Sequence, residues 1–396
     1  MNEVLPTAES DSGTAPRASS NIRHLCRIEI EGGGQIVMDG DYAYIGHQHR
    51  PHGTTILDIA DPRKPKIVSN LKSDHPWSHA HKVRVVGDVM VVNSEFEGGP
   101  DARRGEYTDG GFRIYDVSDR SQPKLLSFVK THGKGVHRFD MDENYAYIST
   151  EMEGFVGNIL VIYDIRDPSK PVEVSRWSME RQHVAGGDDP HPKRADHRLH
   201  HAMRCGTELY AGCWMSGISI VDVSDINAPR TVSRYEYDPP CPEPTHTFLK
   251  VPHRIGGKQI AVSTEEERAH RGVDAGKPHA PLRTWDVSDP TQPKLLHSYY
   301  LAESATPYPA DKVRFGTHQL REKVDRDNLL YVTWFAGGLR IIDINDPANP
   351  QERGYFIPKP GDGVAAPQTN DVFKDQRGLL WVTDKQRGLD VIEYQH

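Results

Sequence analysis

The sequence lacks several features that mark common functional classes. Its 396 residues include four cysteines and no C-x-x-C pair, which argues against a disulfide framework or a zinc knuckle. No apolar run approaches the length of a membrane helix. The formal net charge of −8 is opposite in sign to the basic surface that nucleic-acid binding requires. We therefore expect no nucleic acid and no membrane as partner, and a small-molecule substrate instead.

Familiar catalytic motifs are also missing. The chain has no G-x-S-x-G sequence and no Gly-rich phosphate loop followed by Lys-Ser/Thr, and residues 32–34 lack the strand and helix of a dinucleotide site. Residues 1–22 are polar and small, without the apolar core of a secretory signal. We predict that they form a disordered leader on a cytoplasmic protein, and that residues 23–396 form a single domain.

A short phrase recurs along the chain and ends in an Asp-Pro turn. Its first copy reads Ile-Leu-Asp-Ile-Ala-Asp-Pro-Arg-Lys-Pro over residues 56–65. Proline fixes φ and cannot continue a strand ladder, so each copy predicts a strand followed by a chain reversal. Further copies lie near Ile114, Ile162, Ile220, Asp286 and Ile342.

A hairpin precedes each copy of the phrase, as in residues 136–151 with a turn at 142–144. Hairpin, phrase and following strand make a four-stranded antiparallel blade. Six copies are complete; the seventh lacks a fourth strand, which residues 24–30 can supply. The sequence thus predicts an all-β, seven-bladed β-propeller of four-stranded antiparallel blades, closed by the N-terminal strand completing blade 7. Two β-sandwich domains are the alternative, but no linker-like segment divides the chain.

The repeated pattern Gly-x-x-Ile-x-Asp-Val-Ser-Asp-Pro-x-x-Pro resembles the LVIVD-repeat group of β-propellers. The resemblance covers nearly the whole chain after residue 22. It implies the propeller fold and no single reaction, since that group is defined by its repeat.

Histidines are unusually frequent, with 21 in the chain, and many recur at one position of the repeat. A single histidine there would usually bond to neighbouring backbone. First strands line the channel of a propeller, so histidines at one level in five consecutive blades indicate a metal ion held by neutral imidazoles. The predicted ligands are His81, His137, His201, His246 and His318.

Glutamates end the second strands of three blades and fall beside these histidines. They are Glu95, Glu151 and Glu265. A metal-bound imidazole usually donates its other N–H to a carboxylate, so we predict that the glutamates orient the ligands. Direct coordination by the glutamates is the alternative.

Other residues at the same end of the blades are candidates for catalysis or substrate contact. His79 and His200 lie next to predicted ligands, and His47 lies near the corresponding strand end of the first blade. We interpret these three as candidate catalytic residues. Residues that break the repeat could line a substrate pocket or simply pack: Trp214, Phe335 and Asn370.

The pattern of histidines backed by glutamates is similar to the iron(II) site of the carotenoid-cleaving dioxygenases, which are also seven-bladed propellers. That similarity implies Fe(II) and an O₂-using oxidoreductase acting on a small organic substrate. Copper, manganese and zinc also suit imidazole ligands. A metal-dependent hydrolase or lyase, with His79 or His200 carrying a proton, is the second hypothesis. A non-enzymatic propeller that binds a protein is the third. The sequence does not indicate an oligomeric state.

Overall fold

The computed structural model describes residues 15–99, 101–267, 280–308 and 313–395. Strands dominate these ranges, and none of their helices is long and apolar enough to span a membrane. The described helices are short 3-10 turns: η1 Arg104–Glu106, η2 Val184–Gly186, η3 Arg194–Asp196 and η5 Glu303–Ala305.

The strands form antiparallel sheets that follow one another in chain order. One sheet contains β3 Gly33–Asp39, β4 Tyr42–His47, β5 His52–Asp58 and β6 Lys66–Lys72. The next contains β7 Ser78–His79, β8 Val83–Val86, β9 Val89–Phe96, β10 Gly111–Asp116 and β11 Lys124–Lys130. A third contains β12 Val136–Met141, β13 Tyr145–Glu151, β14 Asn158–Asp164 and β15 Val172–Trp177.

The following eight strands form one continuous sheet, whose two halves are joined by a single residue pair. The first half contains β16 His197–Cys205, β17 Glu208–Trp214, β18 Ile218–Asp222 and β19 Arg230–Tyr235. The second half contains β20 Thr245–Ile255, β21 Lys258–Glu265, β22 Leu282–Asp286 and β23 Lys294–Tyr299. The two halves pair only where Trp214 meets Thr245.

Strands from near the N-terminus complete the last two sheets. The strands β24 Leu329–Thr333, β25 Leu339–Asp343 and β26 Gln351–Ile357 are joined by β1 Arg17–Ala18. The strands β27 Thr369–Lys374, β28 Leu380–Asp384 and β29 Arg387–Tyr394 are joined by β2 Ile22–Glu31. Part of the segment expected to be a leader therefore belongs to the fold, because β1 pairs with β26. Residues 1–14 lie outside the described ranges.

Tight turns capped by an aspartate explain why the repeated phrase ends each strand. The second aspartate of the phrase accepts a hydrogen bond from the backbone N–H two residues further on, an arrangement that stabilises a tight turn. Asp61 receives it from Arg63 at 3.0 Å and Asp119 from Ser121 at 3.0 Å. The same contact forms at Asp167, Asp225, Asp289 and Asp346.

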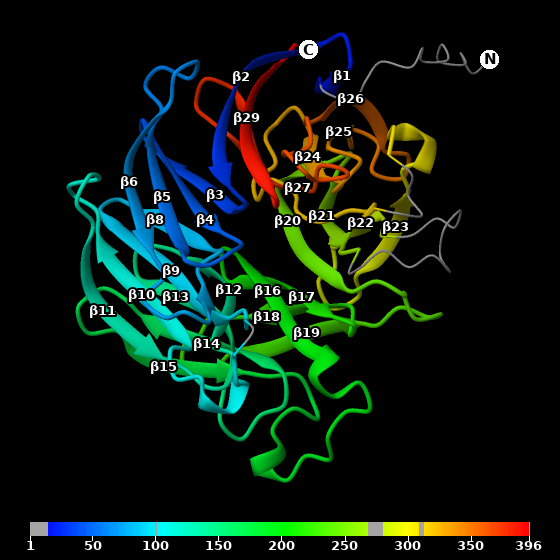
Figure 1. Cartoon of the computed structure of the whole chain (residues 1–396). Helices are drawn as coiled ribbons and strands as arrows, with labels where there is room; N and C mark the ends of the chain where they lie inside the picture. Colours follow the sequence, from blue (N-terminus) through cyan, green and yellow to red (C-terminus); the bar gives the residue numbers. More distant parts are fainter. Residues whose placement is uncertain (1–14, 100, 268–279, 309–312, 396) are drawn as a thin grey trace.

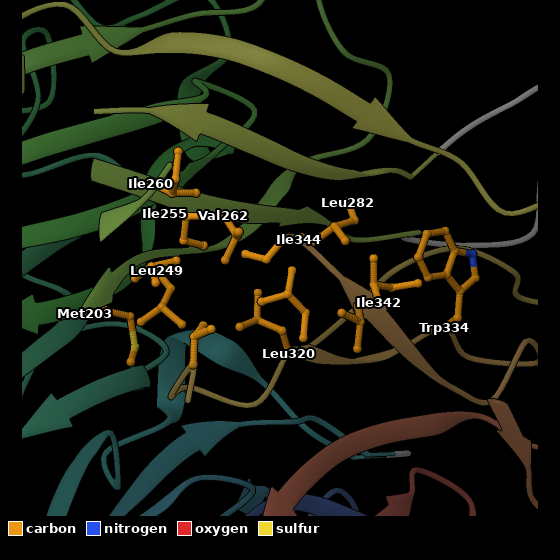
Figure 2. Packing of buried hydrophobic residues seen from close by; sticks show 14 of the residues in the cluster. Met203, Leu249, Ile255, Ile260, Val262, Leu282, Leu320, Trp334, Ile342 and Ile344 are labelled. Atoms are coloured by element: carbon orange, nitrogen blue, oxygen red, sulfur yellow. The ribbon is translucent and has the colours of Figure 1, made fainter. Parts of the chain in front are cut away.

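The sheets are arranged around a centre, with β3, β12, β16, β20 and β27 innermost (Figure 1). These inner strands contact one another across sheets, β3 with β27 and β12 with β16. The core lies between neighbouring sheets. One cluster contains Val262 of β21, Leu320 and Ile342 of β25, with Trp334 at its edge (Figure 2). Burial of such side chains supplies about 1.5–3 kcal/mol each, and it holds the inner strands in place around the centre.

The ion pairs between β2 and β29 allow a test of how the chain ends are joined. Arg27 donates to the buried carboxylate of Asp390 at 2.6 Å, whereas Arg23 meets Glu393 at an exposed position. We expect Arg27→Met to lower the free energy of unfolding by about 3 kcal/mol, because it strands a buried charge. Arg23→Met, on the same strand, should cost less than about 1 kcal/mol.

Urea unfolding of both variants checks this prediction. Equal losses in the two variants would show that the buried contact does not hold β2 to β29.

Candidate metal centre

The pairing register of the inner strands defines equivalent positions in the different sheets. Arg138 pairs with Ser149, and Asp371 pairs with Thr383. The residue that precedes the first member of each such pair, His137 before Arg138 and Asn370 before Asp371, lies at the same level of its inner strand. On this register the level is occupied by His81, His137, His200, His246, His318 and Asn370.

In the sheet of β16, the pairing register differs by one residue from the alignment of repeats predicted from the sequence. His201 pairs with Gly212, and an irregularity separates it from His197 in the ladder. His200 therefore takes the position predicted for His201. The His201 imidazole is fully buried, and neither ring nitrogen has a hydrogen-bond partner among the described residues. Its nearest carboxylate is that of Glu322, at 3.9 Å.

A one-residue difference also affects the glutamates. Asn93 in β9 and Thr264 in β21 are the counterparts of Ser149. Two residues after them lie Glu95, in β9, and Glu266, just beyond β21. Glu265, the residue predicted from the sequence, instead accepts hydrogen bonds from Tyr237 at 2.6 Å and Thr245 at 2.8 Å. It also pairs with Arg283, so its carboxylate is bonded within the blade and not to an imidazole.

Glu151 occupies the equivalent position in β13. The sequence predicted that it pairs with His137, but the structure shows no such contact. Its two oxygens accept hydrogen bonds from Arg104 at 2.6 and 2.7 Å. A cavity of about 660 Å³ lies beside this ion pair, lined also by Tyr107 and Phe155. The carboxylate that reaches His137 is instead Glu95 of the neighbouring sheet.

Six imidazoles lie in one continuous row. Neighbouring ring centres are 4.1 Å apart for His79 and His81, and 5.3 Å apart for His81 and His137. The row continues through His200 at 4.7 Å, then His246 and His318, at 4.3 Å for each step. The structure thus brings together four of the five predicted ligands and both histidines expected at the mouth.

Glu95 is the carboxylate at one end of this row. It contacts His137 Nδ1 at 2.9 Å, His79 Nε2 at 3.1 Å and His81 Nε2 at 3.8 Å. Burial alone would raise the pKa of Glu95, but attraction to His137 and hydrogen bonds from His137 and His79 hold it well below its usual range. Glu95 is therefore an anion at neutral pH.

Glu266 is the carboxylate at the other end. Its oxygen pairs with Arg314 and lies 4.0 Å from His318 Nε2. Burial would raise the pKa of Glu266, but the charges of Arg314 and Lys385 and a hydrogen bond from Arg314 lower it to about 2. Ligand atoms of Glu266, His200 and His246 lie within 4.8 Å of one another, as do those of Glu95, His79 and His81.

The Nδ1 atoms of four imidazoles are already occupied. His200 Nδ1 contacts the His246 carbonyl at 2.6 Å, and His318 Nδ1 contacts the Asn370 carbonyl at 2.7 Å. His246 Nδ1 lies 2.9 Å from the Thr247 hydroxyl, and His137 Nδ1 lies against Glu95. A carbonyl or carboxylate accepts a hydrogen bond from Nδ1–H, so a neutral imidazole in this position keeps a free lone pair on Nε2.

These free nitrogens suit a divalent transition-metal ion. Burial lowers the pKa of His137, His200, His246 and His318, so the imidazoles are neutral. Nε2 of His137 and Nε2 of His200 are 2.8 Å apart. With a proton on each Nδ1, two lone pairs face each other there, and a shared cation would relieve the repulsion. Two imidazoles bound at about 2.0–2.1 Å to one ion come similarly close.

The remaining predicted residues have different positions. His47 contacts the Glu31 carbonyl of β2 at 3.0 Å and the Thr55 hydroxyl of β5 at 2.7 Å, so both ring nitrogens are bonded outside the imidazole row. Trp214 stacks on His200 at 4.8 Å, and Phe335 lies 4.9 Å from His318. Asn370 donates to the Gly34 carbonyl at 3.0 Å.

Glycine at position 34 lets the sheets approach at the level of the imidazoles, since a Cβ there would lie 2.2 Å from the His81 carbonyl oxygen.

Comparison with known proteins agrees with this architecture. A family model described as the LVIVD repeat matches residues 34–72, 107–131, 139–178 and 326–356. The chain therefore contains LVIVD repeats, as the sequence predicted. No curated protein matches it.

Solved structures with the same arrangement are β-propellers of low sequence identity. The C-terminal WD40 domain of Sif2 is 12% identical with a TM-score of 0.55, over 93% of this chain and 97% of that one. The periplasmic gluconolactonase PpgL of Pseudomonas aeruginosa is 15% identical with a TM-score of 0.56, over 86% and 87%. At these identities the likeness establishes the all-β propeller-like fold alone.

We predict that stability depends on pH because of two histidines outside the row. Burial lowers the pKa of His47 and of His197 to about 4. Below the unfolded value of about 6.5 the unfolded chain binds protons that the folded chain does not, so stability falls as pH drops from about 6.5 towards 4. Each group contributes up to about 1.4 kcal/mol per pH unit.

Urea unfolding at several pH values measures this slope. Replacing His197, which contacts Ser216 and the Glu180 carbonyl, by Asn should flatten the slope by up to about one proton. A slope identical to that of the unchanged protein would contradict the assignment.

Proposed function

We propose that the sheets form seven blades closed by the N-terminal strand. Three observations support this. The eight-stranded sheet divides at the single pair between Trp214 and Thr245. The bridge between Leu320 and Val332 supplies an inner strand for the sheet of β24. The strand β2 pairs with β29 from Ile22 to Glu31. Seven inner strands then surround the row of imidazoles.

We further propose that the protein is a metal-dependent enzyme whose ion is held by the imidazole row. The observation that carries the proposal is the engaged Nδ1 atom in each of His137, His200, His246 and His318. Purely structural histidines need no common orientation, whereas metal-binding imidazoles require one nitrogen free and the other fixed. The donor set is neutral nitrogen with two nearby carboxylates, which suits iron, copper or zinc.

The proposed reaction class is an O₂-using oxidation of a small organic substrate with Fe(II). A bound iron ion would supply one-electron chemistry with oxygen, and the protein residues supply orientation and proton control. Glu95 fixes the ring of His137. His79 lies between the Gln48 carbonyl at 2.9 Å and Glu95 at 3.1 Å. Both of these partners are hydrogen-bond acceptors, so His79 can donate an N–H towards either side.

A metal-dependent hydrolase or lyase is the second candidate, and the His79–Glu95 pair favours it. A carboxylate bonded to a histidine beside a metal site can accept a proton from water. The two classes differ in their need for oxygen: activity that persists anaerobically indicates the second, and O₂ uptake with turnover indicates the first.

Metal content is the direct test of the site. We expect protein purified without chelators to hold about one equivalent of tightly bound transition metal, with iron the proposed ion. His246→Ala should lower occupancy strongly while leaving the melting temperature nearly unchanged. His253→Ala is the control, because His253 bonds Asn328 outside the row at 2.7 Å.

Plasma emission spectrometry and thermal melting measure these quantities. A folded wild-type protein that takes up no transition metal overturns both enzymatic hypotheses and leaves a propeller that binds another protein.

The neighbouring glutamates provide a matched pair of variants. Glu266→Gln should weaken metal binding by about 10–100-fold, because its carboxylate lies among His200, His246 and His318. Glu265→Gln should leave metal affinity unchanged and instead destabilise the fold, since it disturbs the buried contacts with Tyr237 and Arg283. Competition with a chelating dye measures the affinity. The opposite ranking would favour the strand alignment read from the sequence.

A further inference from the structure

Two aromatic side chains cover imidazoles of the row in similar ways. Trp214 stacks on His200, with the ring centres 4.8 Å apart and the ring planes inclined by 23°. Phe335 lies 4.9 Å from His318, with the planes inclined by 34°. Trp214 is 8% exposed and Phe335 is fully buried. Of the two roles that the sequence left open for these residues, burial favours packing against the row.

An arginine guanidinium lies over each of these aromatic rings. The central guanidinium carbon of Arg198 is 4.3 Å from the ring centre of Trp214, and that of Arg314 is 3.9 Å from the ring centre of Phe335. A cation over an aromatic face is attracted by the electrons of the ring. Arg314 also pairs with Glu266. The same arginine therefore holds an aromatic ring and a carboxylate that both lie at the imidazole row.

The two aromatic residues share an unusual backbone conformation. Their φ angles are 52° at Trp214 and 40° at Phe335, in the left-handed region that bulky side chains rarely adopt. Trp214 pairs with Thr245, the first residue of β20. Phe335 pairs with Thr369, the first residue of β27. The strained conformation thus recurs at equivalent places in two sheets, and such strain is concentrated at functional sites.

A hydrogen bond at one nitrogen does not fix the orientation of an imidazole completely. In His200 and in His318, Nδ1 contacts a main-chain carbonyl oxygen, at 2.6 and 2.7 Å. A ring held only at this edge can still swing about the hydrogen bond. Trp214 and Phe335 add a contact with the face of each ring. Edge and face contacts together set the direction of Nε2.

We propose that Trp214 and Phe335 are positioning residues of the metal centre, which fix the ring planes of His200 and His318. The proposal rests on the proposed function, because the direction of Nε2 matters when that atom must point at an ion. A ligand that is already held in its binding geometry loses less freedom when the ion binds, which strengthens binding.

Substitutions of two buried tryptophans test the proposal. Trp214→Leu should weaken iron(II) binding at least about tenfold, as the loss of an orienting partner typically does. Trp214→Phe keeps an aromatic face and should restore most of the affinity. Trp177→Leu is the matched control, because Trp177 is also buried but lies on the edge strand β15 and donates to Thr231 at 2.9 Å. The control should lose stability and keep its affinity for iron(II), measured by competition with a chelating dye.

NMR of the metal-free protein, labelled with 13C in its histidines, reports ring position separately from metal binding. The ring current of Trp214 shifts the signals of the imidazole stacked on it, and the spectrum of His200→Gln identifies those of His200. The His200 signals should move in Trp214→Leu and stay in place in Trp177→Leu.

Each outcome decides one claim. His200 signals that stay in place in Trp214→Leu overturn the proposal, and so does iron(II) binding by this variant as tight as that of the unchanged protein. Affinity that Trp214→Phe does not restore overturns the role of the aromatic face. Phe335→Leu should weaken iron(II) binding through His318, and it keeps the test valid if Trp214→Leu does not fold. If the unchanged protein takes up no metal but its His200 signals move as expected, the metal-dependent function fails while the positioning of the imidazole stands.

Discussion

The pairing register between first and second strands is the constraint on which the centre of this protein depends. Side chains alternate between the faces of a strand, so a shift of one residue exchanges those that face the centre for those that face a neighbouring sheet. The ladder places His200 in the imidazole row and leaves His201 below it. It likewise directs Glu266 to the row and Glu265 into its own blade.

Burial gives the same centre its electrostatic character. Withdrawal from water keeps the imidazoles neutral, since a protonated ring there would lack solvation. The carboxylates stay ionised because each has a positive or hydrogen-bonding partner, His137 for Glu95 and Arg314 for Glu266. Neutral nitrogen donors and fixed anions together describe a site that suits a cation.

Much of the fold could be predicted from local chemistry. The recurring aspartates form the turns that their spacing indicates, for example Asp61 with Arg63. The strand beginning near His24 pairs with the last strand of the chain. The turns depend on contacts within a few residues. The closing strand could be predicted because the last repeat lacks its fourth strand. The extra pairing of Arg17 with Ile357 leaves no such signal, because two residues are too few to show a pattern.

The sequence by itself determined the repeated unit, the level at which histidines recur and the presence of glutamates at the strand ends, because these follow from periodicity. Only the tertiary structure decided which neighbour each side chain meets. Glu95 contacts His137 of the next sheet as well as His79 of its own, and Glu151 turns to Arg104. The reason is physical: irregular steps in the inner ladders and contacts between sheets join residues far apart in the chain, and no local pattern records them.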